Sequence, residues 1–395
     1  MSEADRLDHA GRVTLRHIRL THFRNYMAQV LDFSGTHVVL TGHNGAGKTN
    51  LLEAVSFLSP GRGLRRAAYS DVTSVQEKQG ESGFSIHARL FGPAYGEAHI
   101  GTGVMPAVQG EGGRKIRINS AAGAADQLLD YCRIVWLVPA MDGLFTGPGG
   151  ERRRFLDRMV LAIDPLHGRR TLDYEKAMRA RNRLLAEGAR DPVWLEALEV
   201  QMAELGTAIA AARVEMMRLL QAVIGHMPEA GGFPRAELAL AGTVEKAVGL
   251  MAAVDAEEHF RALLERGRGI DGRAGRALEG PHRSDLLVRH AEKAMPAGLC
   301  STGEQKALLT GLVLSHARLT AELSAMTPIL LLDEIAAHLD TVRRKALFDI
   351  LDGLGAQAFM TGTDAALFKD LQGRAEFFHV EGGVAARTDP SVSLP

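Results

Sequence analysis

Cysteine is nearly absent from this chain, and neither sign of charge is in excess. Cys132 and Cys300 are the only cysteines in 395 residues, which excludes a disulfide framework and a four-cysteine zinc site. Lys and Arg number 46 against 47 for Asp and Glu, so the net charge of −1 provides no overall attraction to nucleic acid or to a membrane surface. Any binding of DNA must therefore come from local basic patches.

Aromatic residues and long apolar runs are also scarce. Aromatic side chains make up 5% of the chain, too few for a base-stacking platform, so recognition of a duplex backbone is favoured over extended single-strand binding. No apolar stretch approaches the roughly 20 residues that a membrane span requires. Residues 1–12 are acidic and polar, unlike a signal peptide. We expect a protein of the reducing cytoplasm without a membrane partner.

The composition and its order along the chain predict an α/β protein of two or three structural units. Hydrophobic residues make up 46% of the chain, enough for a sizeable core. Residues 13–138 contain short apolar runs typical of strands, although residues 101–115 are rich in glycine and predict a flexible connection. Residues 151–227 have helical spacing, and α/β patterns return after Gly280. The predicted parts are residues 1–150, residues 151–279, which form a helical lobe, and residues 280–395.

Residues 41–50, TGHNGAGKTN, fit the spacing of a phosphate-binding loop. Small residues let backbone N–H groups turn inward around a polyphosphate, Lys48 reaches the outer phosphates, and the Thr49 hydroxyl can bind Mg²⁺. A buried strand pattern precedes the loop and a helical pattern follows it, which is the setting that the motif needs. We predict nucleotide contacts from Asn44, Gly45, Ala46, Gly47, Lys48, Thr49 and Asn50.

Residues 328–340, PILLLDEIAAHLD, place two acidic side chains directly after a buried apolar strand. Such a strand can run beside the strand of the phosphate loop, with its carboxylates at the same sheet edge. Asp333 would then hold the hydration shell of Mg²⁺, and Glu334 would orient and deprotonate an attacking water. Two acids after a strand can also be a solvated strand end, but the phosphate loop favours the catalytic interpretation.

Residues 300–314, CSTGEQKALLTGLVL, begin a helix whose free N–H groups and serine hydroxyl can receive anionic oxygens. Their position ahead of the acidic strand matches the signature motif of ABC-type ATPases, and the same residues can also form a capping box. In ABC-type heads the signature of one subunit covers the phosphate loop of its partner. We therefore predict an ATP-dependent homodimer in which the second copy contributes Ser301, Gly303, Glu304 and Gln305.

Further segments resemble one family, the RecF family of SMC/Rad50-like ABC ATPases, over almost the whole chain. LTHFRNY at residues 20–26 is similar to the family's N-terminal strand motif, and GPHRSDL at residues 280–286 is similar to a family hallmark. WLVPAMDGLFTGPGGERRRFLDR at residues 136–158 resembles the family's proline-bearing turn and following helix, and TGTD at residues 361–364 falls at its switch position. The sequence departs from the family pattern at Gly63, Ser284 and His338, where Ser, an acid and Glu are usual.

This resemblance implies an ABC-type ATPase head with a phosphate loop and mixed sheets, built from residues 1–150 and 280–395, and an inserted α-helical lobe. It implies ATP and Mg²⁺ as cofactors, with slow, DNA-stimulated hydrolysis. It also implies binding to single-stranded and double-stranded DNA, especially at gaps and junctions, to help load a recombinase. The implied partners are RecR, with RecO and RecA in the pathway, and the implied processes are recombinational DNA repair, DNA replication and the SOS response.

Arginines concentrate within residues 151–190 and 261–283, where contacts to phosphates would bind DNA without reading its sequence. We predict such contacts at Arg152, Arg153 and Arg154, although a helix-surface arginine can equally be solvated or paired with Glu.

Three alternatives to this function remain open on the sequence. A transporter ATPase subunit is disfavoured because the signature follows the loop lysine by 253 residues (301 − 48). A nuclease-linked ATPase is disfavoured because only 62 residues (395 − 333) follow Asp333. A DNA clamp that uses ATP only to dimerise is disfavoured by Glu334, which indicates hydrolysis.

Overall fold

The computed structural model describes residues 11–74, 83–105, 113–188, 192–226 and 232–388. The chain divides into two compact units. Unit 1 comprises Met1–Asp142, Pro228–Phe233 and Val313–Pro395, and unit 2 comprises Gly143–Met227 and Pro234–Leu312. The division at Leu312 falls inside one helix, α9 (Thr302–Ser324).

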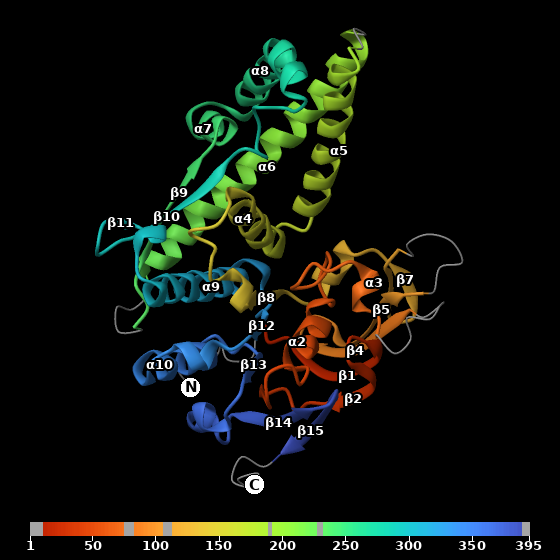
Figure 1. Ribbon diagram of the computed structural model, residues 1–395, viewed down its shortest axis with the longest axis vertical. Helices are drawn as coiled ribbons and strands as arrows, with labels where there is room; N and C mark the ends of the chain where they lie inside the picture. The colour runs from red at the N-terminus through yellow and green to blue at the C-terminus, as the bar shows by residue number, and fades with distance from the viewer. Residues whose placement is uncertain (1–10, 75–82, 106–112, 189–191, 227–231, 389–395) are drawn as a thin grey trace. The chain divides into compact units, whose positions relative to one another are not determined.

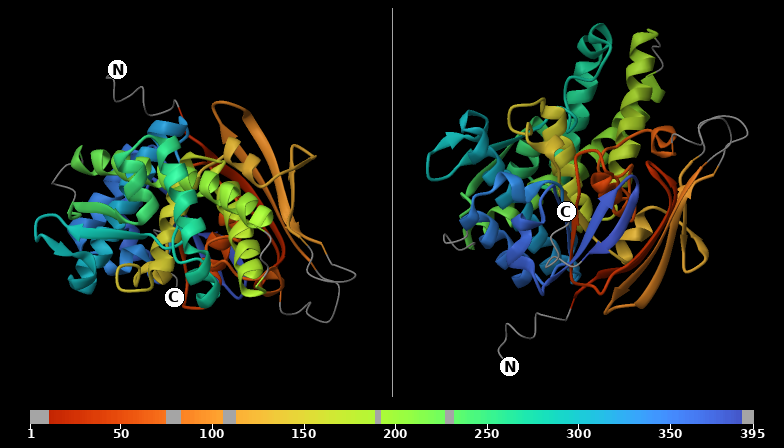
Figure 2. Two further views of the ribbon diagram at one scale, coloured as in Figure 1. Left: turned by 90° about the horizontal axis from the view of Figure 1, so that it is seen from above. Right: turned by 60° about the horizontal axis from the view of Figure 1, so that its bottom comes forward.

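Unit 1 contains two six-stranded sheets, the first of which is antiparallel throughout. Its strands, red to orange in Figure 2, form a twisted layer. In spatial order they are β2 (Tyr26–Asp32), β1 (Thr14–Phe23), β4 (Phe84–Gly92), β5 (Gly96–Val104), β6 (Lys115–Ile118) and β7 (Ala121–Gly123).

The second sheet joins segments from both ends of the chain. Five of its strands are parallel and the edge strand β15 is antiparallel to its neighbour. In spatial order they are β15 (Val384–Thr388), β14 (Ala375–Glu381), β3 (His37–Thr41), β13 (Ala358–Gly362), β12 (Ile329–Leu332) and β8 (Ile134–Leu137). Strand β3, from the first part of the chain, therefore lies between β14 and β13, which come from its last part.

Both sheets contribute to one apolar core. Strands β1 and β4 largely alternate buried and more exposed residues, as expected for an antiparallel sheet with one face on a core. All five residues of β3 are buried, which is typical of a central parallel strand. Helix α2 (Lys48–Ser56) packs into the same core through Leu51, Leu52 and Val55.

Besides α2 and the last part of α9, two α-helices lie within the described residues of unit 1. They are α3 (Tyr69–Val72) and α10 (Thr341–Gly353). Asp340 caps α10, since its side chain accepts a hydrogen bond of 2.8 Å from the backbone N–H of Arg343. This cap satisfies one of the free donors at the helix start, and α10 then buries Leu347, Phe348 and Leu351.

The flexible connection predicted for residues 101–115 is wrong at both ends, because β5 extends to Val104 and β6 begins at Lys115. Ala98, Ile100 and Thr102 of β5 are buried in alternation, whereas glycines occupy positions on the opposite face. The high glycine content hid this alternation in the sequence. Residues 106–112 of the predicted connection lie outside the described residues.

Unit 2 is mainly helical and also contains a three-stranded sheet. Its helices are α4 (Gly149–Ile163), α5 (His167–Ala186), α6 (Pro192–His226), α7 (Thr243–Leu250) and α8 (Ala253–Ala274), together with the first part of α9. Its strands, in spatial order, are β11 (Met295–Pro296), β10 (Asp285–His290) and β9 (Ala236–Ala241). Helices α5 and α6 run side by side and α8 packs against both (Figure 1). Because β10 pairs with β9, residues 280–312, which the sequence division placed in the last part, group with these helices.

Buried ion pairs join the helices of unit 2. The Arg181 side chain is fully buried and donates to Glu199 at 2.9 Å, to Asp271 at 2.7 Å and to the backbone carbonyl of Leu264 at 2.6 Å. Its partners thus come from α6 and α8. These three acceptors compensate the buried guanidinium for the loss of its hydration.

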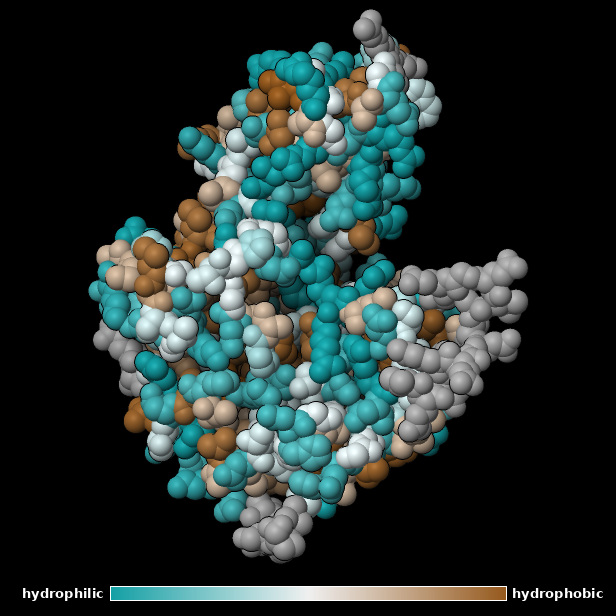
Figure 3. Space-filling model, in the orientation of Figure 1, coloured by the Kyte–Doolittle hydropathy of each residue, from teal (hydrophilic) through white to brown (hydrophobic). Residues whose placement is uncertain are grey.

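The surface shown in Figure 3 is mostly hydrophilic, with apolar patches over α7 and α8. Leu250, Met251 and Val254, at the junction of these helices, are exposed. Among the described residues, no helix combines the length and the apolar content that a membrane span requires.

Candidate nucleotide-binding site

The phosphate loop connects β3 to α2 in unit 1. Gly42 has a φ of 142°, and a Cβ atom built there would lie 2.2 Å from the carbonyl oxygen of Val380, so only glycine fits. The Lys48 ammonium is buried and donates to the carbonyl oxygens of Gly42 at 2.6 Å and His43 at 2.8 Å. Burial lowers the pKa of Lys48, and the carboxylates of the acidic strand oppose this shift. The Lys48 side chain therefore lies against the phosphate loop, where it is predicted to bind the outer phosphates.

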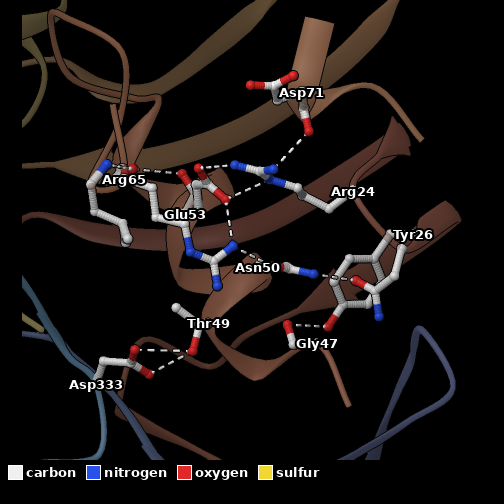
Figure 4. Close-up of polar contacts among 12 residues, drawn as sticks. Arg24, Tyr26, Gly47, Thr49, Asn50, Glu53, Arg65, Asp71 and Asp333 are labelled. Carbon is white, nitrogen blue, oxygen red and sulfur yellow. Dashed lines mark hydrogen bonds and ion pairs between the residues drawn. The ribbon is translucent and has the colours of Figure 1, made fainter. Parts of the chain in front are cut away.

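Side chains from the turn between β1 and β2 and from the first residue of β2 hold the loop from the other side. Asn25 donates from its side-chain amide to the carbonyl oxygen of Ala46 at 2.9 Å, and the Tyr26 hydroxyl donates to the carbonyl oxygen of Gly47 at 3.0 Å. Asn50 donates to the side-chain oxygen of Asn25 at 2.7 Å (Figure 4). Asn25 and Tyr26 end the LTHFRNY motif, but the motif alone does not indicate that they bind the phosphate loop.

A buried carboxylate supports the first turns of α2. Glu53 is fully buried and accepts hydrogen bonds from Arg24 at 2.8 and 2.7 Å and from Arg65 at 3.0 Å. Arg65 also donates to the side-chain oxygen of Asn50 at 2.5 Å (Figure 4). Two arginines compensate for the burial of this charge, so the helix that begins at the loop is fixed to the first sheet.

The acidic strand β12 brings Asp333 to the loop. The Thr49 hydroxyl lies 3.0 Å from each carboxylate oxygen of Asp333 and donates to this carboxylate (Figure 4). The backbone N–H of Asp333 donates to the carbonyl oxygen of Leu137 at 2.9 Å, which fixes the strand end. Residues 284 positions apart thus meet at the carboxyl edge of the parallel sheet, where α/β proteins bind their ligands.

The prediction that the acidic strand runs directly beside the strand of the phosphate loop is wrong. Strand β13 lies between them and pairs in parallel with both. Thr361 of β13 is fully buried; its hydroxyl donates to Asp333 at 2.7 Å and accepts from the backbone N–H of Glu334 at 2.8 Å. Glu334 itself has a φ of 55°. One hydroxyl from the intervening strand therefore holds both acidic residues.

Thr361 begins the TGTD segment, but it was not among the site residues predicted from the sequence. A usable signal was present, because Thr361 ends a buried apolar run and the carboxyl ends of parallel strands meet at one edge. The bond to Glu334 depends on the left-handed backbone at that residue, which the sequence does not indicate.

The oxygen atoms of Thr49 and Asp333 are the kind of ligands that Mg²⁺ prefers. Within the described residues, no group of three or more His, Cys, Asp or Glu side chains could hold a metal ion. This arrangement fits Mg²⁺, which usually keeps several waters and is held by one or two protein groups together with the phosphates of a nucleotide.

The signature segment forms a capping box at the start of α9. Ser301 donates from its hydroxyl and from its backbone N–H to Glu304 at 2.8 and 3.0 Å, and the backbone N–H of Glu304 donates back to the Ser301 hydroxyl at 3.4 Å. Lys293 also pairs with Glu304, and these contacts, the one with Lys293 first, lower the pKa of Glu304 to about 2. Gln305 is buried and donates to the carbonyl oxygen of Cys300 at 2.8 Å, whereas Gly303 is exposed. The capping role is thus present, and a contact with a second copy stays a prediction.

All three arginines predicted to contact DNA have partners inside unit 2, and two of them bond to the segment that begins β10. Arg152 forms two hydrogen bonds of 2.7 Å with Asp285, and Arg153 donates to the carbonyl oxygen of Ser284 at 2.7 Å. These bonds join α4 to the start of β10 and argue against DNA contacts from Arg152 and Arg153. Arg154 is more exposed and pairs with Glu151 within α4 at 2.7 Å.

The three departures from the family pattern fit their surroundings. Gly63 has a φ of 69°, where a Cβ atom would lie 2.8 Å from the Ser56 hydroxyl. Ser284 is buried and accepts from Arg213 at 2.7 Å. His338 is exposed at the end of a short 3-10 helix, η6 (Ile335–His338).

Known proteins align with nearly the whole chain. The sequence is 64% identical over 372 residues to the DNA replication and repair protein RecF of Brucella suis biovar 1 (strain 1330), covering 94% of this chain and 96% of that relative. The chain belongs to the RecF family. The family model described as the RecF/RecN/SMC N terminal domain matches residues 14–386, which confirms the family predicted from the sequence motifs.

Solved structures confirm the predicted fold. A structure of the recombination mediator protein RecF-ATPrS in the RecFOR pathway superposes with a TM-score of 0.84 at 24% identity, covering 96% of this chain and 100% of that one. An Smc head domain from Pyrococcus furiosus superposes with a TM-score of 0.52 at 16% identity, covering 95% and 96% of the two chains. The fold is therefore that of an ABC-type ATPase head with an inserted helical lobe, and the family does not favour a transporter subunit or a nuclease-linked ATPase.

Proposed function

We propose that this RecF-family chain is an ATP-controlled DNA-binding protein of DNA replication and recombinational repair. The observation that carries the proposal is the meeting of Thr49, Asp333 and Thr361 beside the phosphate loop. A fold of this family and an assembled loop-and-carboxylate pair together support binding of a nucleoside triphosphate. The family relatives named DNA replication and repair protein RecF support DNA as the second ligand.

Nucleotide binding would use the loop backbone and its lysine. Lys48 would exchange its bonds to two loop carbonyls for phosphate oxygens, while Thr49 and Asp333 would hold Mg²⁺, which neutralises charge on the phosphates. Glu334 would orient and deprotonate the attacking water. Thr361 would keep Glu334 and Asp333 in register through its two bonds. Slow hydrolysis would then act as a switch rather than as a metabolic reaction.

The proposed switch is dimerisation. Ser301, Gly303 and Glu304 lie at the start of a helix, with the first two exposed, so their N–H and hydroxyl groups can reach a ligand held by a second copy. ATP on the phosphate loop of one chain would be covered by the signature of the other. Hydrolysis would remove the shared phosphate and release the dimer.

The proposed task is loading of a recombinase at DNA gaps and single-strand/double-strand junctions. The proposed protein partner is RecR, which would act with RecO and RecA. The structurally similar recombination mediator protein of the RecFOR pathway supports this assignment.

Sedimentation velocity with and without ATP and DNA tests the proposal. The chain should sediment as a monomer alone and as a dimer with ATP. Lys48→Ala should lose ATP binding and the dimer, because Lys48 supplies a charge-assisted bond of about 1.5–3 kcal/mol. Unchanged nucleotide affinity of Lys48→Ala in equilibrium dialysis would refute the assigned role of the loop.

Mixing variants tests whether the site is shared. Ser301→Arg should bind ATP as a monomer but block the dimer through its bulk, whereas a simple cap would cost only about 1 kcal/mol of stability and leave dimerisation intact. A mixture of Ser301→Arg with Lys48→Ala can form one intact composite site. Partial recovery of hydrolysis supports sharing, and absence of recovery at every ratio, although the mixture sediments as a dimer with ATP, contradicts it.

A further inference from the structure

The first sheet of unit 1 carries a row of polar side chains on the face opposite its core. Register places Asp32 of β2 opposite His17 of β1, His17 opposite Arg89 of β4, and Arg89 opposite His99 of β5. Side chains of directly paired residues lie on the same face of a sheet. The four residues therefore form one continuous row across four strands.

A second row lies beside the first. Arg19 of β1 is paired with His87 of β4, His87 with Gly101 of β5, and Gly101 with Arg117 of β6. Arg19, His87 and Arg117 are exposed. A Cβ atom built at Gly101 would meet only the Cβ atom of Arg117, at 3.8 Å. The glycine therefore leaves an open place between the His87 and Arg117 side chains.

A third row completes this surface with small side chains and one more cation. Thr21 is paired with Ser85, Ser85 with Gly103, and Gly103 with Lys115. We call the parts of these rows that lie on β1, β4, β5 and β6 the histidine face, and Asp32 of β2 lies at its border. It comprises His17, Arg19, Thr21, Ser85, His87, Arg89, His99, Gly101, Gly103, Lys115 and Arg117.

Cations outnumber acids on and around the histidine face. Its rows contain three arginines and one lysine, while the acids at its border are Asp32 and Glu97. These acids are shared, since Arg89 lies 3.4 Å from Asp32 and 3.8 Å from Glu97. Three histidines can add further positive charge on protonation.

The three histidine rings are close enough to interact. The centroids of His17 and His87 are 6.3 Å apart and those of His87 and His99 are 5.7 Å apart. His17 bonds Asp32 at 2.8 Å and His99 bonds Glu97 at 3.0 Å. His87 lies between these two rings, and neither of the two contacts supplies it with a carboxylate. An anion placed over His87 would thus meet cations from β1, β4 and β6.

We propose that the histidine face binds the phosphate backbone of double-stranded DNA. This inference rests on the DNA-binding function proposed above and assigns it to a surface that the sequence analysis did not consider. The rows contain no Phe, Tyr or Trp, although Phe91, paired with Glu97, is exposed at their border; this composition favours backbone contacts over stacking on bases. Serine, threonine, lysine and arginine are the side chains that commonly contact DNA phosphates, and the two glycines let a strand approach the sheet.

The same geometry makes binding depend on pH. The His87 side chain is exposed, but neighbouring side chains partly desolvate its ring; this desolvation lowers the pKa of His87, and the charges of His99, His17, Arg19 and Arg89 lower it further. A phosphate would favour the protonated ring and raise this pKa in the complex. A group whose pKa rises on binding strengthens binding at low pH and loses that contribution as the pH rises through the pKa of the complex. Affinity for DNA should therefore increase as the pH falls from 8 to 6.

Fluorescence anisotropy with a labelled duplex oligonucleotide and ATP tests the proposal over a series of salt concentrations. Each phosphate contact contributes about 0.9 to the slope of log affinity against log salt. Arg19→Gln combined with Arg117→Gln should reduce that slope by about 2, whereas the matched control Lys369→Gln, on an exposed residue of η7 (Ala365–Leu371), should leave it unchanged. His87→Gln should flatten the pH dependence, and His379→Gln on β14 should not.

The remaining outcomes show whether this inference alone fails or whether the proposed DNA binding fails with it. If the parental chain binds the duplex and the double variant binds with the same salt slope, the assignment to the histidine face is wrong while DNA binding stands. If the parental chain binds no duplex, both fail. If poly-glutamate displaces the duplex from the parental chain at equal charge concentration, the face accepts acidic protein segments and the assignment to DNA is wrong. Equal melting temperatures of parental and variant chains ensure that lost binding is not lost folding.

Discussion

Thr361 offers the sharpest test of how the site is built, because one buried hydroxyl serves both acidic residues. It donates to the Asp333 carboxylate at 2.7 Å and accepts from the Glu334 backbone N–H at 2.8 Å. Thr361→Val keeps the branched shape and removes only the hydroxyl. The substitution therefore isolates the two hydrogen bonds from the packing of β13.

The expected loss of stability follows from those two bonds. A hydrogen bond to a charged group contributes about 1.5–3 kcal/mol, and a buried N–H without a partner costs about 1–3 kcal/mol. The two effects share one atom and are not additive, so we expect about 3–4 kcal/mol. A domain of 150–250 residues loses about 2–4 °C of melting temperature per kcal/mol, which predicts a decrease of at least about 6 °C for unit 1.

Thermal unfolding of three variants measures this loss. Thr320→Val is the matched control, since Thr320 is also fully buried but donates to a neutral helix carbonyl, that of His316, at 2.8 Å. Its cost should be about 1 kcal/mol. Thr361→Ser restores the hydroxyl and should recover most of the loss, leaving about 0.8 kcal/mol for the missing methyl group.

Loss of the Thr361 hydroxyl should reduce ATP hydrolysis as well as stability. Without Thr361, Asp333 keeps its bond from Thr49, but Glu334 loses its anchor. Hydrolysis should therefore fall more than ATP affinity in Thr361→Val, and Thr361→Ser should restore it. If Thr361→Val melts within 1 °C of Thr320→Val and hydrolyses ATP at the parental rate, the hydroxyl does not position the acidic pair.

Two further predictions concern charge. Glu334→Gln should bind ATP and hold the dimer longer while hydrolysis is lost, as measured by phosphate release and sedimentation; hydrolysis at the parental rate would exclude Glu334 as the base. Asp157→Asn should cost about 3 kcal/mol at pH 7 and less near pH 3, measured by thermal unfolding at both pH values. Burial raises the pKa of Asp157, but the hydrogen bond with His167 and the charge of Arg213 lower it more, so the contribution is present above about pH 4 and is lost as the pH falls through the lowered pKa. An equal loss of stability at both pH values would show that the charge of the Asp157 carboxylate does not stabilise the fold.

Local patterns were sufficient for the main elements of the site. The glycine spacing before Lys48 and the apolar run before Asp333 each depend on short-range chemistry, and both are legible in the sequence. The capping box at Ser301 and Glu304 was equally legible, because its two residues are three positions apart. Such features need no knowledge of the rest of the fold.

Features that depend on strand order were missed. The sequence indicates that the strands before Lys48 and Asp333 are buried, but their separation by β13 is a property of the whole sheet. The carboxylate partner of Arg152, Asp285, likewise lies on β10, 133 positions away, so the arginine-rich surroundings of Arg152 suggested DNA instead of an internal ion pair. Composition identifies charge but not the distant residue that neutralises it.

The position of β13 also explains why a side chain of that strand, Thr361, contacts the two acidic residues. Neighbouring strands lie about 4.8 Å apart, so β3 and β12 are separated by roughly 10 Å and their backbones cannot bond each other. Thr49 crosses this gap from the helix side and reaches the carboxylate of Asp333, while Thr361 reaches the same carboxylate from within the sheet. If Thr49 turns toward a bound metal ion and relaxes its contact with Asp333, the bond from Thr361 can persist. The intervening strand therefore gives the acidic pair a support that nucleotide binding does not need to break.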